Sequence, residues 1–342
     1  MATFAGAAHT PSVQAADAPG GLPYTGVNIA GGEFFDPLVK RSPVYGKDYI
    51  YPTRDQIAYY AHKGVNIIRV PFRWETLQKE PGQPLVEAEL KRIIEVVDIA
   101  TQRGMAVILD PHNYARYDGK VIGSSELPAS AFADFWSRLA VPFIGKGNVW
   151  FGLVNEPHDM PTEQWVKAAN AAIAAIRKTG ATNLILVPGN GWSNAGGWNE
   201  DWYGTPNARA MLAIRDPGRR FLIEVHAYFD KDGSGKTPDI VSPTIGSERL
   251  RGFTEWCRRH KMRAFLGEFA VAPTELGHQV IDDIMHFMLT NRDVWVGFAW
   301  WAGGAWWGDH FFSIEPHEGR DKPQMRFLQP YLQPLVKRSA KP

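Results

Sequence analysis

Residues 66–72 read NIIRVPF and residues 106–112 read AVILDPH, and these two stretches decide the fold class. Both are short, nearly continuous apolar runs, which is typical of strands buried on both faces of a sheet. Between them, four apolar residues follow the i, i+3, i+4, i+7 spacing of an amphipathic helix: Leu90, Ile93, Ile94 and Val97. A strand, a helix and a second strand in this order predict two parallel strands joined by a helical crossover.

The same alternation continues in both directions along the chain. The eight strand candidates are 26–31, 66–72, 106–112, 149–155, 184–189, 221–229, 264–269 and 296–302. Eight strand and helix units match a closed (β/α)8 barrel, the TIM barrel, better than an open doubly wound sheet. An open Rossmann-like sheet would also require a G-x-G-x-x-G turn after the first strand, and residues 30–34 read AGGEF. The predicted fold class is therefore an α/β TIM barrel.

The chain has 342 residues, and no linker or charge run divides it. We expect one domain over residues 21–342, preceded by a flexible segment at residues 1–20 that lacks the basic and apolar regions of a signal peptide. Lys and Arg number 37 against 36 Asp and Glu, a balance that argues against nucleic acid as a partner. The single Cys257 excludes an intramolecular disulfide framework, and no apolar run is long enough for a membrane span.

Polar residues stand at the predicted C-terminal ends of the strands, where barrels of this kind gather their functional groups. They are Asn28, Arg69, His112, Asn113, Asn155, Glu156, Asn190, His226, Tyr228, Glu268 and Trp301. Glu156 and Glu268 belong to the fourth and seventh strands, which face each other across the barrel mouth. Two opposed carboxyl groups are what cleavage of a glycosidic bond requires, one as proton donor and one beside the sugar C1. The alternative is that each glutamate only pairs with a buried cation such as Arg69.

Three further side chains on these strands have candidate roles. Arg69 lies in an otherwise apolar strand and needs a carboxylate partner, which the sequence leaves open between Glu268 and Asp110. His226 and Tyr228 are two residues apart and so share one face of a strand. The tyrosine hydroxyl could donate to Glu268 while His226 contacts a sugar or the other acid; a histidine merely buried in the barrel is the alternative.

Aromatic residues point toward carbohydrate. Eight of the 13 tryptophans lie in residues 192–202 and 295–307, and flat apolar rings in a cleft suit sugar faces. Trp192, Trp306 and Trp307 are candidate platforms. The histidines have no H-E-x-x-H or similar spacing, so we expect neither a metal nor a cofactor. No G-x-S-x-G elbow is present, which argues against an α/β-hydrolase.

Five motifs in this order resemble glycoside hydrolase family 5, within it the endoglucanase (cellulase) branch. They are RVPFRWE around Arg69, LVNEPHD around Glu156, EVHAYFD around His226, FLGEFA around Glu268 and FAWWAGGAWWGD around Trp301. The resemblance extends from about residue 26 to residue 316. It implies that Glu156 is the general acid/base and Glu268 the nucleophile of a retaining mechanism. It also implies that the subsite is completed by Arg69, His112, Asn155, His226, Tyr228 and Trp301. Asn113 is adjacent to His112, so at most one of these two points inward while the other lines the rim.

The resemblance sets further expectations. Asn155 would donate to the sugar 2-hydroxyl, Glu156 would have a raised pKa, and Arg69 and Tyr228 would keep Glu268 ionised. The implied activity is an endo-acting β-1,4-glucanase, secreted because its polymeric substrate cannot enter a cell, and acting as a monomer on β-glucan. Mannanase, xylanase and mixed-linkage glucanase activities share the chemistry and stay open. A non-catalytic glycan-binding barrel is a weaker alternative, because both acids are present.

Overall fold

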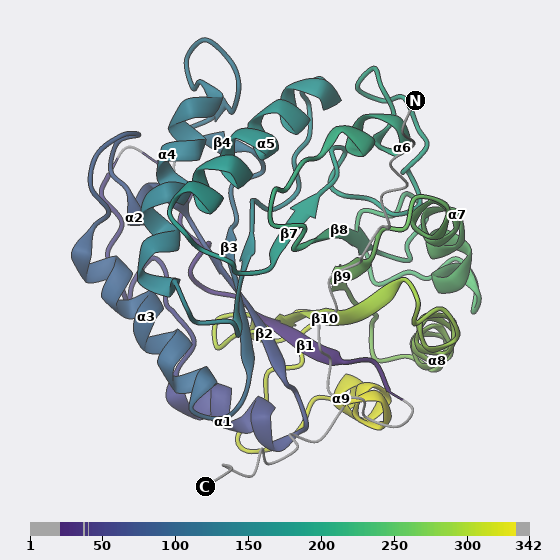
Figure 1. The fold of residues 1–342 in the computed structure, drawn as a ribbon. Coiled ribbons are helices and arrows are strands. Elements are labelled where there is room, and N and C mark those ends of the chain that lie inside the picture. The colour runs from purple at the N-terminus through teal and green to yellow at the C-terminus, as the bar shows by residue number, and fades with distance from the viewer. Residues whose placement is uncertain (1–20, 37, 40, 333–342) are drawn as a thin grey trace, which may run out of the picture.

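Eight parallel strands close into a barrel in the computed structural model, which describes residues 21–36, 38–39 and 41–332 (Figure 1). Around the barrel the strands follow the order β1, β10, β9, β8, β7, β6, β3, β2. Their bounds are β1 Tyr24–Ile29, β2 Ile67–Phe72, β3 Ala106–Pro111, β6 Val149–Gly152, β7 Ile185–Pro188, β8 Phe221–Ala227, β9 Ala264–Phe269 and β10 Trp295–Gly303. The predicted single-domain TIM barrel is confirmed, while the expected flexible segment at residues 1–20 lies outside the described residues.

All eight predicted strands are present, although some end earlier than expected. The fourth candidate, 149–155, forms a ladder only over Val149–Gly152. Beyond it, Leu153 still donates its backbone N–H to the carbonyl of Leu186, and the chain then turns over the barrel mouth. Glu156 adopts a positive φ of 42° at this turn. The shortened strand therefore places Glu156 on the loop above the barrel instead of in the wall.

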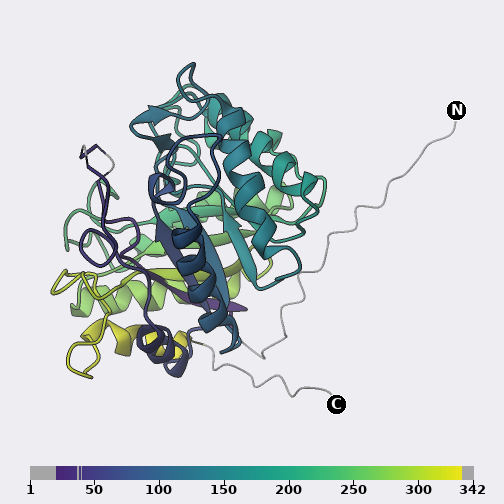
Figure 2. The same ribbon diagram turned by 90° about the vertical axis from the view of Figure 1, so that its left-hand side faces the viewer.

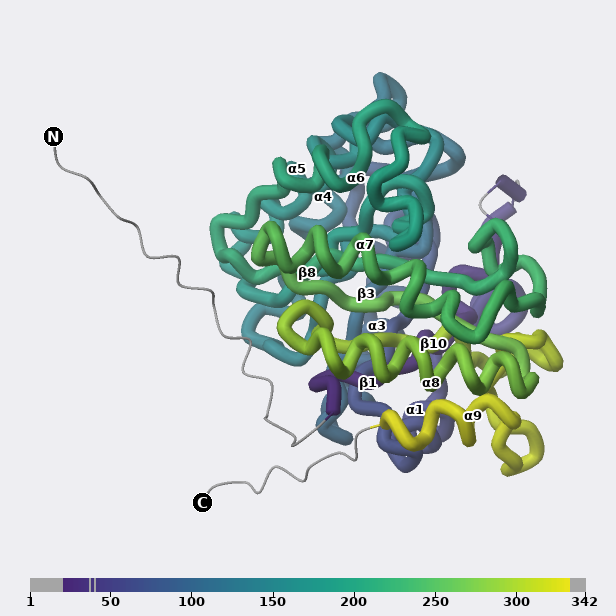
Figure 3. Tube along the Cα trace, turned by 90° about the vertical axis from the view of Figure 1, so that its right-hand side faces the viewer, coloured from purple at the N-terminus to yellow at the C-terminus, as the bar shows by residue number. Residues whose placement is uncertain are grey.

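Helices cover the outside of the barrel. The long ones are α1 (Arg54–His62), α3 (Glu87–Thr101), α4 (Ala129–Ala140), α5 (Thr162–Lys178), α7 (Ile245–Arg259) and α8 (Glu275–Thr290). Figure 2 shows the blue helices of the N-terminal half against the strands, and Figure 3 shows α7 and α8 side by side on the opposite flank. In the part of the chain that the structure describes, no helix has both the length and the apolar character needed to cross a bilayer.

Shorter elements fill the connections between these helices and strands. They are α2 (Trp74–Leu77), α6 (Asn207–Ala210), α9 (Pro323–Leu328), the 3-10 turns η1 (Val141–Phe143), η2 (Met211–Ala213) and η3 (Gln329–Tyr331), and the hairpin of β4 (Arg116–Tyr117) with β5 (Lys120–Val121). Helix α9 ends two residues before Pro330, which has no backbone N–H to continue a helix.

Side chains inside the barrel change character from one end to the other. The lower layers are apolar and include Ile67, Ile108, Trp150, Leu222 and Phe265. Strand residues alternate between inside and outside, so the next inward positions on β2, β3 and β8 lie two residues further along. Those positions hold charged groups, each at most 1% exposed: Arg69, Asp110 and Glu224. A buried charged layer thus separates the apolar barrel core from the mouth.

Candidate active site

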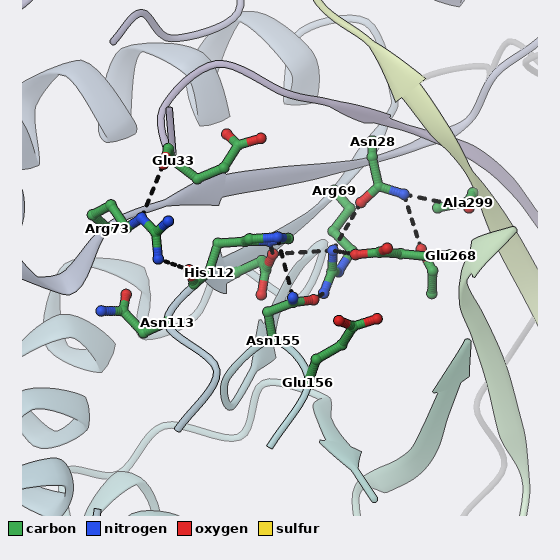
Figure 4. A network of polar contacts seen from close by, with 12 residues as sticks. Asn28, Glu33, Arg69, Arg73, His112, Asn113, Asn155, Glu156, Glu268 and Ala299 are labelled. Atoms are coloured by element: carbon green, nitrogen blue, oxygen red, sulfur yellow. Dashed lines mark hydrogen bonds and ion pairs between the residues drawn. The ribbon is translucent and has the colours of Figure 1, made fainter. Parts of the chain in front are cut away.

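Arg69 is the centre of the buried charged layer (Figure 4). Its Nη1 lies 2.9 Å from Glu268 Oε1 and 3.0 Å from Asp110 Oδ2, and its Nε lies 3.0 Å from Glu224 Oε1. Burial acts to lower the pKa of Arg69, but these three carboxylates outweigh it and raise the pKa above its usual range. Both partners left open by the sequence, Glu268 and Asp110, therefore contact the guanidinium.

Two asparagine amides complete the contacts of the guanidinium. Asn28 Oδ1 accepts from Arg69 Nη1 at 2.9 Å, and Asn155 Oδ1 accepts from Nη2 at 2.8 Å. Asn28 in turn donates through Nδ2 to the backbone carbonyls of Gly267 and Ala299 (Figure 4). Side chains from five strands or strand ends thus fix the arginine, and the arginine in turn holds Oε1 of Glu268.

Glu156 and Glu268 meet above this layer. One carboxylate oxygen of each, together with a ring nitrogen of His226, lie within 4.8 Å of one another. His226 Nδ1 is 2.7 Å from Glu156 Oε1 and 3.6 Å from Glu268 Oε2. Tyr228 donates its hydroxyl to Glu268 Oε2 at 2.8 Å. The structure therefore brings together both acids and the two β8 side chains expected beside them.

Charge at this cluster follows from the crowding of carboxylates. Burial acts to lower the pKa of His226, but Glu268, Glu156 and Glu224 outweigh it and raise the pKa to about 10, so the ring is an imidazolium at neutral pH. Burial raises the pKa of Glu268, with Glu156 acting in the same direction and with His226 and Arg69 opposing it. The expectation is that Arg69 and Tyr228 keep Glu268 ionised. Arg69 does act in that direction, but burial of the charged carboxylate outweighs it, so the net shift of the pKa is upward.

The three close groups also have the spacing of a metal site. Their hydrogen bonds point to a different use. Arg69 and Tyr228 already donate to the two oxygens of Glu268, and an imidazolium has no free lone pair for a cation. The arrangement suits one carboxylate held for attack beside a second carboxyl group that can exchange a proton better than it suits metal coordination.

His112 lies beside the acids, whereas its neighbour Asn113 does not. His112 Nδ1 is 2.8 Å from Asp110 Oδ2, and its ring stacks on Trp301 with centroids 5.1 Å apart. Asn113 Oδ1 accepts from the backbone N–H of Trp74, and its Nδ2 donates to Glu75 at 2.7 Å. Both ends of the Asn113 amide therefore bond to residues of α2. The structure does not bring Asn113 to the two acids.

The last barrel strand presents one of its paired tryptophans to the site. Trp300 is fully buried and donates its Nε1 to the carbonyl of Phe312. Trp301 is half-buried and follows on the other face of the strand, with a cis peptide bond to Ala302. Trp301, which stacks on His112, is therefore the one of the two rings that faces the site.

Aromatic rings flank the acids on two sides of the barrel. On the β7 side, Trp192 is 42% exposed and stacks on His158 with centroids 4.7 Å apart. On the β10 side, Trp306 is 40% exposed, and Trp307 packs edge-on against Trp301 at 5.8 Å. Because β7 lies across the barrel from β1, the neighbour of β10, these platforms stand on opposite sides of the barrel mouth.

Sequence reasoning did not assign a role to Glu224, and it named Asp110 only as one possible partner of Arg69. Both are buried and lie 3.0 Å from the guanidinium. A signal was present in each case, because Asp110 precedes His112 by two residues and Glu224 precedes His226 by two. Residues two apart on a strand share a face, so an inward-pointing histidine predicts that the acid two residues before it also points into the barrel.

Comparison with known proteins places these features in a family. Residues 22–304 match the sequence model of cellulase (glycosyl hydrolase family 5). Endo-beta-1,4-glucanase A of Emericella nidulans is 37% identical over 328 residues, which cover 94% of this chain and 96% of that protein. The crystal structure of an endo-beta-1,4-glucanase from Xanthomonas axonopodis pv. citri is 46% identical, with a TM-score of 0.88 over 91% of this chain and 99% of that one. Pseudomonas stutzeri Cel5A, an endoglucanase solved in complex with cellobiose, is 37% identical, with a TM-score of 0.83 over 93% and 94% of the two chains.

Proposed function

Because the chain belongs to the cellulase family, glycosyl hydrolase family 5, we propose that it is an endo-acting β-1,4-glucanase in which Glu156 and Glu268 cleave the glycosidic bond. The observation that carries the proposal is the approach of the two carboxyl groups, whose oxygens come within 4.8 Å above the buried layer. Retaining glycosidases hold their carboxyl groups about 5 to 5.5 Å apart, whereas inverting enzymes need about 6.5 to 9.5 Å for an intervening water. The spacing favours retention through a covalent intermediate.

The first step forms the glycosyl-enzyme. A Glu268 oxygen attacks C1 of the sugar, the bond from C1 to the bridging oxygen breaks, and Glu156 gives its proton to that oxygen. Arg69 and Tyr228 hold the attacking carboxylate in place, since each donates to one of its oxygens. Asn155 donates to the 2-hydroxyl of the same sugar, a contact that strengthens as oxocarbenium character develops.

The second step releases the sugar with its configuration retained. Glu156, now ionised, takes a proton from water while the water oxygen bonds to C1, and the bond from C1 to Glu268 breaks. The imidazolium of His226 lies 2.7 Å from Glu156 Oε1 and keeps that carboxylate oriented in both of its roles. Each acid is regenerated, so the cycle needs no cofactor.

The proposed substrate is cellulose or a related β-1,4-glucan. Pseudomonas stutzeri Cel5A binds cellobiose, which supports a glucan in the corresponding cleft. We further propose that the protein acts as a monomer outside the cell, since a polymer of this size must be met there. The rates at which reducing ends are released from carboxymethylcellulose, barley glucan, mannan and xylan distinguish a β-1,4-glucanase from a mixed-linkage glucanase, a mannanase and a xylanase. Faster hydrolysis of mannan or xylan than of both glucans would contradict the assignment.

Azide rescue tests the two roles separately. Replacing Glu268 by Ala should abolish hydrolysis of an aryl β-cellobioside, and azide should restore turnover with an α-glycosyl azide as product, because azide attacks from the face that the carboxylate has vacated. The Glu156→Ala variant should instead yield the β-azide through the intact nucleophile. Interchanged products would reverse the two assignments. Isosteric Glu268→Gln should bind cellopentaose without hydrolysing it, which controls for loss of the fold.

A further inference from the structure

The amide of Asn155 has an orientation that its neighbours determine. Arg69 Nη2 lies 2.8 Å from Asn155 Oδ1, and a guanidinium can only donate, so the amide oxygen must face Arg69. The amide nitrogen then faces His112, with Nδ2 3.1 Å from His112 Nε2. Because an amide nitrogen also only donates, His112 Nε2 must accept and carries no proton.

The tautomer of His112 follows from that contact. The proton of its ring lies on Nδ1, 2.8 Å from Asp110 Oδ2, which accepts it. Asp110 is fully buried, and its Oδ2 forms an ion pair with Arg69 Nη1 at 3.0 Å. Burial acts to raise the pKa of Asp110, but Arg69 and His112 outweigh it and lower the pKa, so the acceptor is a carboxylate. The alternative tautomer of His112 would direct an N–H at the NH₂ group of Asn155.

We propose that Asp110 is a positioning residue that acts on substrate recognition through His112 and Asn155. By selecting the Nδ1-protonated form of His112, the carboxylate holds one Asn155 N–H on His112 and leaves the other free. That remaining N–H is the one that donates to the 2-hydroxyl of the sugar at the bond being cleaved. The inference rests on the proposed function, in which Asn155 makes this contact.

The chain offers a matched control in Glu224. Glu224 and Asp110 are both buried, both lie 3.0 Å from a nitrogen of Arg69, and both follow the same inward face of the barrel. Glu224 lies beside His226, 3.6 Å from its Nε2, instead of beside His112. Removing either carboxylate takes one ion-pair partner from Arg69. Only the loss of Asp110 also removes the acceptor that selects the Nδ1-protonated tautomer of His112.

The experiment compares an aryl β-cellobioside with its analogue that lacks the 2-hydroxyl on the ring bonded to the aryl group. The kcat/KM of the parent cellobioside divided by that of the 2-deoxy analogue measures the contribution of the 2-hydroxyl contact. Asp110→Ala should lower this ratio at least about tenfold, and Asn155→Ala should lower it by the same factor, since a lost hydrogen bond of about 1.4 kcal/mol corresponds to that factor. The Asp110→Ala, Asn155→Ala double variant should lower it no further.

Controls separate positioning from general damage. Glu224→Ala should keep the wild-type ratio even where its overall activity falls, and Asp110→Asn, which retains an oxygen acceptor, should keep most of it. An unchanged ratio in Asp110→Ala would overturn the inference. Failure of the wild type to hydrolyse the cellobioside would contradict the proposed function instead.

A second measurement depends neither on activity nor on whether Asp110→Ala folds. Nitrogen-15 spectra of the imidazole rings distinguish the two neutral tautomers, and the His112 signals are assigned by their loss in His112→Gln. The wild-type protein should show His112 protonated on Nδ1. Protonation on Nε2, or on both nitrogens at neutral pH, would overturn the proposal even if Asp110→Ala does not fold.

Discussion

Tyr228 provides one of the two hydrogen bonds that favour the ionised form of Glu268. In Tyr228→Phe that bond, 2.8 Å long, is lost while the ring is kept. The pKa of Glu268, already raised by burial, should rise further, because a donor to a carboxylate stabilises its charged form. Since attack requires the carboxylate, the acidic limb of kcat/KM should move to higher pH by about one unit.

The pH profile of an aryl cellobioside measures that shift. Tyr203→Phe is the control, because its hydroxyl donates to Asp159 on the β6 loop, where it is not in contact with Glu268. An acidic limb that stays in place in Tyr228→Phe, or that moves equally in both variants, would show that the Tyr228 hydroxyl does not set the ionisation of the nucleophile.

Arg69 holds the charged layer together, so its removal should cost stability. Arg69→Met would leave Asp110, Glu224 and Glu268 buried without their shared cation, a change expected to lower the free energy of unfolding by about 3 to 5 kcal/mol. The exposed pair of Arg258 with Asp293 gives a control, and Arg258→Met should cost less than about 1 kcal/mol. Urea unfolding monitored by tryptophan fluorescence measures both.

The stability lost in Arg69→Met should depend on pH. Arg69 lowers the pKa of both Asp110 and Glu268, and burial raises it, so without the guanidinium the folded-state pKa values of these two carboxyl groups should rise above those of the unfolded chain. Such groups destabilise the fold increasingly as pH rises above their unfolded values near 4, so the deficit should be larger at pH 7 than at pH 5. A deficit that is constant over this range would indicate lost packing instead of uncompensated charge.

At the residue scale, sequence predicted the two acids and most of their neighbours but not how each side chain is used. His112 and Asn113 are adjacent, and the sequence could only say that one of them points inward. The structure directs His112 to the acids and engages Asn113 with α2, because Trp74 and Glu75 supply its partners from a helix of four residues. Partners that lie about 40 positions away leave no local signal.

At the element scale, the seam between β1 and β10 tests the barrel closure. Gly297 pairs with Tyr24, and a Cβ added at Gly297 would lie 2.1 Å from the backbone oxygen of Tyr24. Gly297→Ala should therefore destabilise the protein by roughly 1 to 3 kcal/mol, since backbone cannot move aside as a flexible side chain can. Gly147→Ala, where a Cβ meets open space, should change stability by less than about 0.5 kcal/mol. Equal urea midpoints for the two variants would contradict this account.

The strands could be predicted because each is a nearly continuous apolar run, but register could not. Along β9, a Cβ at Gly267 would point at the buried Glu224, so strict alternation would turn Glu268 outward. A shift in the pairing of β8 with β9 after Val225 instead sets Glu268 opposite His226. Alternation gives the face of a residue only while the ladder is regular, and irregularities of this kind gather beside active sites. The short α2, α6 and the β4–β5 hairpin were also beyond prediction, because four residues or fewer carry no period.

At the scale of the whole molecule, the placement of aromatic rings predicts where a glucan chain lies. The acid pair sits over the centre of the barrel, with Trp192 on the β7 side and Trp306 on the β10 side. A chain lying across the mouth would contact rings on both sides of the bond that is cleaved. This geometry suits cleavage within a chain, because sugars on either side contribute to binding.

Loss of either ring should therefore matter more as the substrate lengthens. Trp192→Ala and Trp306→Ala should each lower kcat/KM for cellohexaose by about fivefold, the effect of losing one ring contact worth about 1 kcal/mol. Their effects should multiply in the double variant, because the two rings lie too far apart to share a partner. Cellotriose, too short to reach both platforms, should lose activity in at most one of the two variants, which makes it the internal control. Equal losses on cellotriose and cellohexaose in both variants would mean that the rings support the fold of their loops and do not carry the chain.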